Sequence, residues 1–194
     1  TQTLQDNTFI TVNGFTGTIY EGKADKIEKE ILPVVETKTK VKVIVDLPDF
    51  AERAAKTKCR EVGLLRVEGI IASSGKHPIA YSKEKNTEQY SEILFQGIEK
   101  ISKLFDGVWI RTSDIRTDEF ENLEGAPERE NNPMLGMHGI RASLKNPELL
   151  KAEISAIKKA TEEFPKKKFG IMFPQVISVE ELQEAKKFLE DIKN

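Results

Sequence analysis

Residues 107–141 read GVWIRTSDIRTDEFENLEGAPERENNPMLGMHGIR, and the interpretation of the rest of the chain starts from this stretch. It opens with a short apolar run, Val108–Ile110, that ends abruptly at Arg111. An apolar strand that ends in an arginine and leads into a polar loop is typical of an α/β barrel, which builds its sites at the carboxyl ends of its strands. The loop that follows is about 30 residues long, and such loops in compact domains are usually functional or disordered. Its five carboxylates between Asp114 and Glu124 fit either a solvated, charge-rich loop or part of a site.

Apolar runs and helical patterns alternate from residue 41 onward. Strands are expected at 41–47, 62–68, 108–110 and 169–173, and helices at 48–55, 87–105, 147–164 and after 178, with a loop at 69–86. The order βαβαβαβα predicts parallel strands with right-handed crossovers. Because four such units are half of a (β/α)8 barrel, the predicted fold is α/β: a partial (β/α)8 barrel of about four βα units, preceded by a small β-hairpin segment.

Local signals support these elements. The helix at 87–105 carries one apolar stripe with spacings of 4, 4, 3 and 4 residues, which predicts a buried face: Tyr90, Leu94, Ile98, Ile101 and Phe105. Asn86 with Gln89, and Ser178 with Glu181, have the spacing of capping boxes. Before the barrel-like part, residues 7–22 contain two β-branched runs around Asn13-Gly14, which predicts a hairpin. Residues 23–40 are polar and are expected to be a linker with one or two helical turns.

The composition excludes several classes of partner. The 194 residues include 30 Lys and Arg and 32 Asp and Glu, and the net charge of −2 offers no global attraction for nucleic acid or an anionic membrane. No stretch approaches the ~20 apolar residues that span a bilayer, and no signal peptide is recognisable. The single cysteine, Cys59, excludes an internal disulfide framework and is expected to be a buried or half-buried packing residue. We therefore expect a cytoplasmic protein.

Two arginines are the first candidates for a binding site. Arg66 and Glu68 lie two residues apart in the strand expected at 62–68, so both should point to the same face at its carboxyl end. They form either a pair that closes the barrel mouth, or a site in which Arg66 binds an anion and Glu68 orients it. Arg111 ends the next strand along the chain, and two guanidiniums at one rim can grip a phosphoryl group. By themselves these residues support only an anion site.

The residues also carry a resemblance. RTSDIRTDEFENLEG at 111–125, NPMLG at 132–136 and GIR at 139–141 resemble the signature of the phosphoenolpyruvate (PEP) synthases, or pyruvate, water dikinases. These are part of the PEP-utilising enzyme family, and the resemblance covers nearly all of the chain. It implies that residues 1–22 are the tail of a swivelling phosphohistidine domain, 23–40 a linker, and 41–194 the first half of a PEP- and pyruvate-binding barrel of the TIM type. The chain would then be a piece of a longer protein.

The resemblance also implies roles for individual residues. Arg66 and Arg111 would contact the phosphate of PEP, and Asp114 and Glu119 would have an orienting role. Position 138 is usually an arginine in the family, so His138 weakens this third contact and is either a donor of one hydrogen bond to the anion or a structural residue.

Other family residues are retained or missing. Arg141 matches the pattern as a supporting residue. His77 resembles part of the family's Gly-x-His-Pro loop and is expected to be structural or exposed. The catalytic cysteine, the metal-holding carboxylates and the ATP-binding domain of the family lie outside this sequence, so no catalytic residue, metal site or cofactor is expected in this chain alone. Mg²⁺ and ATP are implied for the complete enzyme.

Two functions remain after this reading. The first is a part of a PEP synthase, a transferase of pyruvate metabolism and gluconeogenesis, which is inactive alone and has pyruvate or PEP and the remaining domains as its partners. The alternative is a non-catalytic half-barrel relative that acts as an assembly or anion-binding module. An open sheet edge and an apolar inner face favour self-association, so a homo-oligomer is expected in either case.

Overall fold

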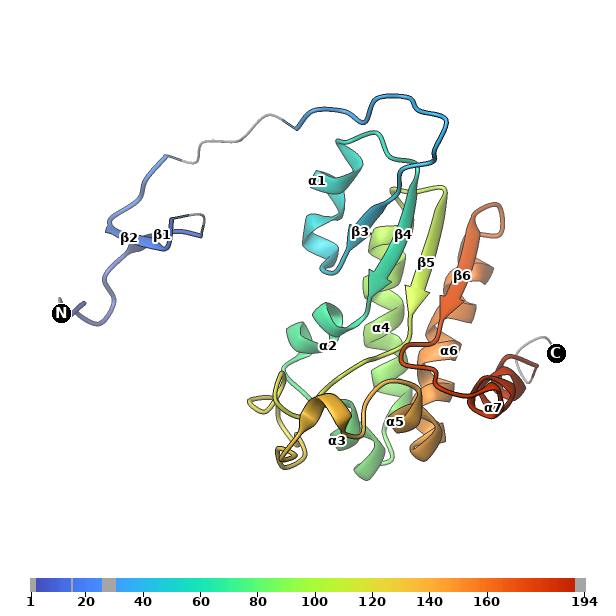
Figure 1. Cartoon of the computed structure of the whole chain (residues 1–194). Helices are drawn as coiled ribbons and strands as arrows, with labels where there is room; N and C mark the ends of the chain where they lie inside the picture. The colour runs from blue at the N-terminus through green and yellow to red at the C-terminus, as the bar shows by residue number, and fades with distance from the viewer. Residues whose placement is uncertain (1–2, 15, 26–30, 191–194) are drawn as a thin grey trace. The chain divides into compact units, whose positions relative to one another are not determined.

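A computed structural model describes residues 3–14, 16–25 and 31–190 of the chain (Figure 1). The chain divides into two compact units, Thr1–Ile31 and Leu32–Asn194. In the first unit β1 (Ile10–Asn13) and β2 (Thr18–Glu21) pair as an antiparallel hairpin, with Asn13 opposite Thr18. The predicted hairpin is thus confirmed.

The linker region holds no helix in its described residues, 23–25 and 31–40. The helical turns expected there centre on residues 26–30, which lie outside the described residues. In the second unit the backbone N–H of Val34 donates to the carbonyl of Thr57 at 2.8 Å. This end of the segment therefore packs as part of the second unit.

Four parallel strands form the centre of the second unit. They are β3 (Val43–Val45), β4 (Glu61–Arg66), β5 (Gly107–Arg111) and β6 (Lys168–Met172), hydrogen-bonded in the order β3-β4-β5-β6. This confirms the predicted number, order and parallel direction of the strands. The described sheet is open, with β3 and β6 at its edges, and closure into a barrel stays a prediction.

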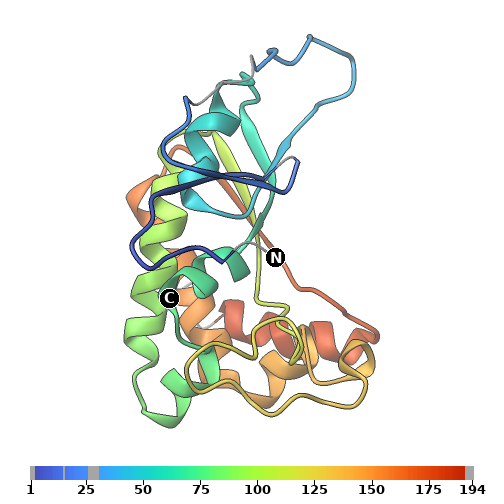
Figure 2. The same cartoon turned by 90° about the vertical axis from the view of Figure 1, so that its left-hand side faces the viewer.

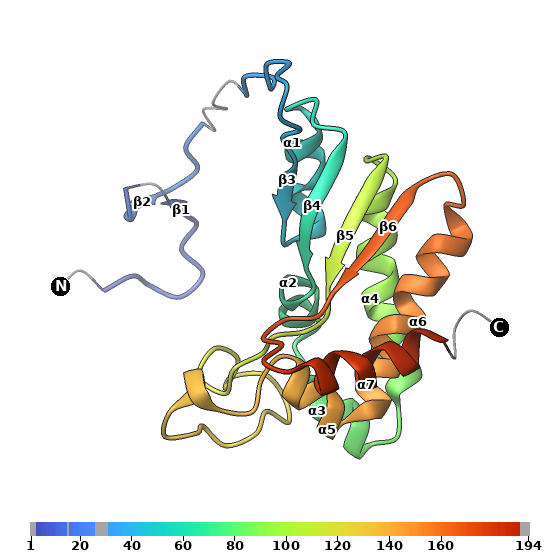
Figure 3. The same cartoon turned by 45° about the vertical axis from the view of Figure 1, so that its right-hand side comes forward.

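Helices α1 (Ala51–Ala55), α4 (Thr87–Ser102) and α6 (Pro147–Glu163) lie along one face of this sheet (Figures 2 and 3). The other helices are η1 (Pro48–Phe50), α2 (Glu68–Ser74), α3 (Pro78–Lys83), η2 (Pro133–Leu135), α5 (Ile140–Lys145) and α7 (Val179–Glu190). The long helices α4 and α6 run side by side along the strands (Figures 2 and 3). All five residues of the predicted stripe are buried; four lie on α4 and Phe105 follows its end. They pack with Val108 and Ile110 of β5 in the core.

The segment expected to be a loop at 69–86 instead holds two helices. β4 ends at Arg66, Val67 has helical backbone angles, and Glu68 is the first residue of α2. Gly75 ends α2 with φ +75°, a conformation that glycine adopts without strain. His77 is buried and caps α3, its Nδ1 accepting the N–H of Ile79 at 3.2 Å. Arg66 and Glu68 are therefore not two residues of one strand.

The two expected helix caps and Cys59 can also be compared with the structure. Ser178 and Glu181 form the expected capping box, with both hydrogen bonds at 3.3 Å. Asn86 precedes α4, but its side chain donates to the Gln89 side chain at 2.7 Å instead of capping the backbone. Cys59 is buried, as expected. Over the described residues no helix has the length and apolar character that crossing a bilayer requires.

The second face of the sheet carries apolar side chains that no helix among residues 31–190 covers. Ile44 and Met172 are 62% and 40% exposed. Trp109 lies on the same face, where the Lys42 ammonium sits 3.6 Å from the centre of its ring. The strands point to the end of the sheet where the loop 112–139 gathers with α3 and α5 (Figures 1 and 3).

Candidate functional site

The carboxyl ends of the strands meet at a cavity of about 580 Å³. Its lining includes six of the seven residues selected from the sequence: Arg66, Glu68, Arg111, Asp114, Glu119 and His138. The seventh, Arg141, is not part of the lining; its guanidinium donates to the carbonyl of Gly136 at 2.8 Å. Arg141 therefore fastens the end of the long loop to α5.

Arg66 and Arg111 are cross-strand partners. They are the last residues of β4 and β5, and they face each other in the parallel register. Neighbouring strands lie roughly 4.8 Å apart, so two side chains at the same level of adjacent strands leave the sheet close together. Both side chains line the cavity. The structure thus brings the two predicted arginines to one rim.

Asp46 holds Arg66 in a two-point contact. Nε of Arg66 donates to Oδ1 of Asp46 at 2.8 Å, and Nη2 donates to Oδ2. These hydrogen bonds raise the pKa of the Arg66 guanidinium above its usual value. Gly69 allows the start of α2 to lie close to the end of β3, because a Cβ at this position would lie 2.2 Å from the Asp46 carbonyl oxygen.

Glu68 pairs with Arg111, whereas the sequence pattern predicted it beside Arg66. Its Oε1 accepts a hydrogen bond from Nη2 of Arg111 at 3.1 Å and another from the N–H of Asp114 at 2.6 Å. The reason is local: because Glu68 starts a helix, its side chain leaves the level of β4 and reaches the neighbouring strand. Among the described residues, Oε2 of Glu68 and Nε of Arg111 are buried without a hydrogen-bond partner.

Asp114 joins three other groups of the cavity. Its Oδ1 lies 2.7 Å from Nδ1 of His138, and its Oδ2 lies 3.7 Å from Nη1 of Arg111 and 3.3 Å from the Gln175 amide nitrogen. The second ring nitrogen of His138 lies 3.1 Å from the carbonyl oxygen of Met134. Both ring nitrogens thus have partners within the protein. Of the two roles left open for His138, the hydrogen bond to an anion would require one of these contacts to be exchanged.

Glu119 lines the cavity beside a third arginine that the sequence reading did not select. Arg116 contacts the carboxylate of Glu119 and lies 3.6 Å from that of Asp118. The hydrogen bond that Arg116 donates to Glu119 raises the pKa of the Arg116 guanidinium. Glu119 therefore orients Arg116, and not the two arginines at the strand ends.

The charges of the cavity are nearly balanced. Three guanidiniums face four carboxylates, those of Asp46, Glu68, Asp114 and Glu119. An anion would be held here by N–H donors in fixed positions and not by a large excess of positive charge. Within residues 3–14, 16–25 and 31–190 no three His, Cys, Asp or Glu side chains are arranged to hold a metal ion.

Asp46 and Gln175 were missed although the sequence contains the signal for both. Each comes shortly after an apolar strand, β3 or β6, which is the same position relative to the sheet that identified Arg111. Gln175 also has φ +60°, a strained conformation for a residue other than glycine, and such strain gathers at functional sites. The rim is defined by polar residues at or shortly after the ends of all four strands, and not only by the arginines of β4 and β5.

A scan against protein-family models matches residues 22–194 to the PEP-binding domain of the PEP-utilising enzymes. Among curated proteins, the chain is 40% identical over 210 residues to phosphoenolpyruvate synthase of Pyrococcus furiosus. It is 41% identical over 196 residues to a probable phosphoenolpyruvate synthase of Archaeoglobus fulgidus. These alignments cover 99% and 96% of this chain and 26% of each relative. The chain thus spans about a quarter of the length of these relatives.

Proposed function

This chain belongs to the PEP-utilising enzyme family, and from this premise we propose that it supplies the arginine-bearing part of a PEP pocket in a phosphoenolpyruvate synthase. The pairing of Arg66 with Arg111 carries the proposal, because it places two guanidiniums at one level of the sheet above one cavity. Planar guanidiniums bind phosphate oxygens at two points each, which lysines cannot do.

In this proposal the carboxylates of the cavity orient the arginines. Glu68 and Asp114 hold Arg111 from two sides, and Asp46 holds Arg66. Arginines fixed in this way neutralise charge on a phosphoryl group without first rearranging, which is how proteins promote phosphoryl transfer. His138 forms the cavity wall next to Asp114 and reaches a bound anion only by exchanging one of its present contacts.

The complete enzyme would transfer a phosphoryl group from a phosphohistidine to pyruvate, and the histidine, the ATP site and the metal ligands would come from other parts of it. We assign no step to Mg²⁺ or ATP at these residues, because Glu68 and Asp114 are already engaged by Arg111 and His138. Residues 1–22 and 23–40 would be the tail of the phosphohistidine domain and a linker. The protein would work in the cytoplasm.

The uncovered face of the sheet is where the remaining half of the barrel would pack. Ile44, Trp109 and Met172 would then lie in the barrel interior, against strands of a longer polypeptide or of a second chain. Exposed apolar side chains of this kind also favour the alternative, an assembly module that self-associates without turnover. Sedimentation together with PEP titration separates the two functions, since the assembly module would form a monodisperse dimer with undetectable PEP binding, whereas part of a PEP pocket would bind PEP.

The proposal is tested by calorimetric titration of PEP into the chain, with and without Mg²⁺. We compare wild type with Arg66→Lys and Arg111→Lys, each of which keeps the charge but loses the two-point geometry. Arg60→Lys is the matched control, because Arg60 precedes the same strand, pairs with Asp106 at 2.6 Å and lies at the opposite end of the sheet. We expect each rim variant to weaken binding at least about tenfold and the control to bind like wild type. Undetectable binding to wild type at millimolar PEP, or equal losses in all three variants, would overturn the proposal.

A further inference from the structure

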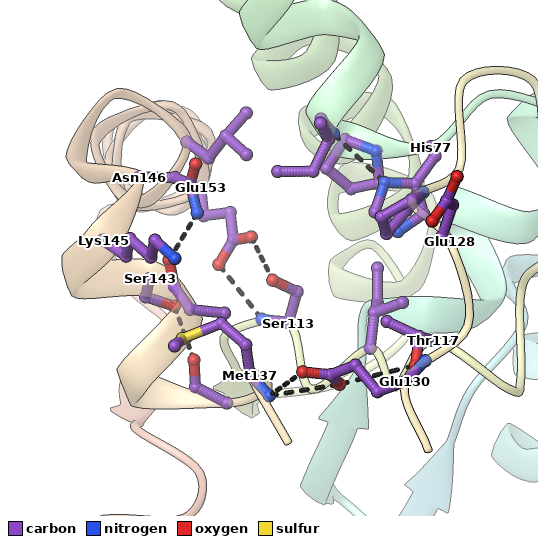
Figure 4. Close-up of a pocket in the computed structure, with 17 residues that line it drawn as sticks. His77, Ser113, Thr117, Glu128, Glu130, Met137, Ser143, Lys145, Asn146 and Glu153 are labelled. Atoms are coloured by element: carbon purple, nitrogen blue, oxygen red, sulfur yellow. Dashed lines mark hydrogen bonds between the residues drawn. The ribbon is translucent and has the colours of Figure 1, made fainter. Parts of the chain in front are cut away.

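A second cavity lies on the other side of the turn that carries Asp114. It measures about 290 Å³ and lies between the long loop and helices α5 and α6 (Figure 4). The turn is shared between the cavities: Asp114 lines the larger one, while Ser113 and Ile115 line the smaller one. A group that holds Ser113 therefore also restrains the backbone next to Asp114.

Glu153 of α6 is such a group. Its Oε2 accepts the backbone N–H of Ser113 at 3.0 Å, and its Oε1 accepts the Ser113 hydroxyl at 2.6 Å (Figure 4). The hydroxyl of Tyr90 also donates to Oε1, at 2.8 Å. One carboxyl group thus holds both the main chain and the side chain of a single turn residue.

The position of Glu153 is unfavourable for a carboxyl group. It is 2% exposed on the buried face of α6, between Leu150, Ile154 and Ile157. This burial raises the pKa of the Glu153 carboxyl. An apolar residue would pack in this core without the cost of burying a carboxyl group. That cost is offset only when the carboxyl group is hydrogen-bonded. Its hydrogen bonds to Ser113 are what an apolar residue could not supply.

The contacts continue from Ser113 into the larger cavity. Asp114 follows Ser113 directly, its N–H bonds to Glu68, and its carboxylate contacts His138 and Arg111. We infer that Glu153 is a positioning residue of the anion pocket, which holds Ser113 so that Asp114 stays in place between Arg111 and His138. This inference rests on the proposed function, since its effect is measured as PEP affinity.

A double-mutant cycle tests it, with PEP titrated into wild type, Glu153→Leu, Asp114→Asn and the double variant. We expect Glu153→Leu to weaken PEP binding about tenfold in the wild-type background and less than about twofold when Asp114 is already Asn. Glu153→Gln should bind within about threefold of wild type, because its amide oxygen can accept the Ser113 N–H and its NH₂ can donate to the hydroxyls. Ile157→Ala, in the same buried stripe, should lower the melting temperature and leave PEP affinity unchanged.

Each result decides the inference. Wild-type affinity in Glu153→Leu, or an undiminished loss in the Asp114→Asn background, would overturn it while leaving the proposed pocket intact. Absence of PEP binding to wild type would overturn both. If Glu153→Leu does not fold, Ser113→Ala takes its place in the cycle, with an expected loss of about threefold that disappears in Asp114→Asn. An equal loss in both backgrounds would overturn the inference.

Discussion

The Asp46 carboxylate faces the Arg66 guanidinium at the ends of neighbouring parallel strands, with Nε of Arg66 2.8 Å from Oδ1. The two side chains are 39% and 45% exposed, so the pair adds little to stability. In the proposed pocket Asp46 occupies the Nε and Nη2 edge of the guanidinium and leaves its Nη1 side to a phosphate. Because Asp46 is negatively charged, we expect it both to orient Arg66 and to weaken the attraction of the pocket for an anion.

Asp46→Asn should tighten PEP binding about threefold. The amide oxygen keeps one hydrogen bond to Nε of Arg66, and the negative charge that repels the phosphate is lost. Stability should change by less than about 0.5 kcal/mol, because the pair is exposed. Calorimetry at two salt concentrations and urea unfolding measure the two effects. Asp49→Asn is the control, since Asp49 pairs with Lys100 away from the cavity. Weaker binding in Asp46→Asn would mean that Asp46 mainly orients Arg66.

His138→Arg should raise PEP affinity about tenfold and lower the melting temperature. A guanidinium at this position can retain the contact to Asp114 and add a charged donor toward the anion. The loss of stability is expected because His138 is only 3% exposed and a longer side chain must fit. His138→Gln, which adds no charge, should not tighten binding. Equal affinities of the Arg and Gln variants would show that position 138 does not face the ligand.

Stability should fall as the pH is lowered through the titration of His77. Burial lowers the pKa of His77 from 6.5 to about 4, so the folded protein favours the neutral ring. The stabilisation is fully present above pH 6.5 and is lost as the pH falls toward 4. We expect roughly 1–3 kcal/mol over this range. Urea unfolding at several pH values measures it.

His77→Asn isolates this titration. Asparagine is a good N-cap and can keep the contact to the N–H of Ile79, but it does not titrate. The difference in unfolding free energy between wild type and His77→Asn should therefore shrink or reverse between pH 6.5 and 4. Parallel curves for the two proteins would assign the acid sensitivity to other groups.

Gly69→Ala should destabilise the protein by about 2 kcal/mol and weaken PEP binding. The added Cβ would meet the Asp46 carbonyl oxygen at 2.2 Å, so α2 must move away from the end of β3. That movement separates Asp46 from Arg66. Gly14→Ala is the control, because a Cβ there meets no atom within 4 Å. Thermal unfolding and PEP titration compare the two. An unchanged melting temperature in Gly69→Ala would mean that α2 can move away from Asp46 without loss of stability.

The helices beside the site were the harder part of the fold to predict. Helix α4 was predictable because its apolar residues recur at helical spacing along 16 residues. The helices α2 and α3 were not, because they have 7 and 6 residues and are too short for a periodic pattern. The strand expected at 62–68 includes Val67 and Glu68. That expectation places Glu68 beside Arg66, whereas Glu68 contacts Arg111.

By itself, the sequence determined four parallel strands, their order, and the presence of Arg66 and Arg111 at their ends, because these follow from apolar patterning and from where each run stops. Only the tertiary structure decided which carboxylate meets which arginine, that Asp46, Arg116 and Gln175 belong to the same rim, and that Glu153 supports the turn from behind. The pairings made by Asp46, Glu68, Glu153 and Gln175 join residues 20 to 61 positions apart. No local pattern encodes them, since they depend on how helices and loops pack against the end of the sheet.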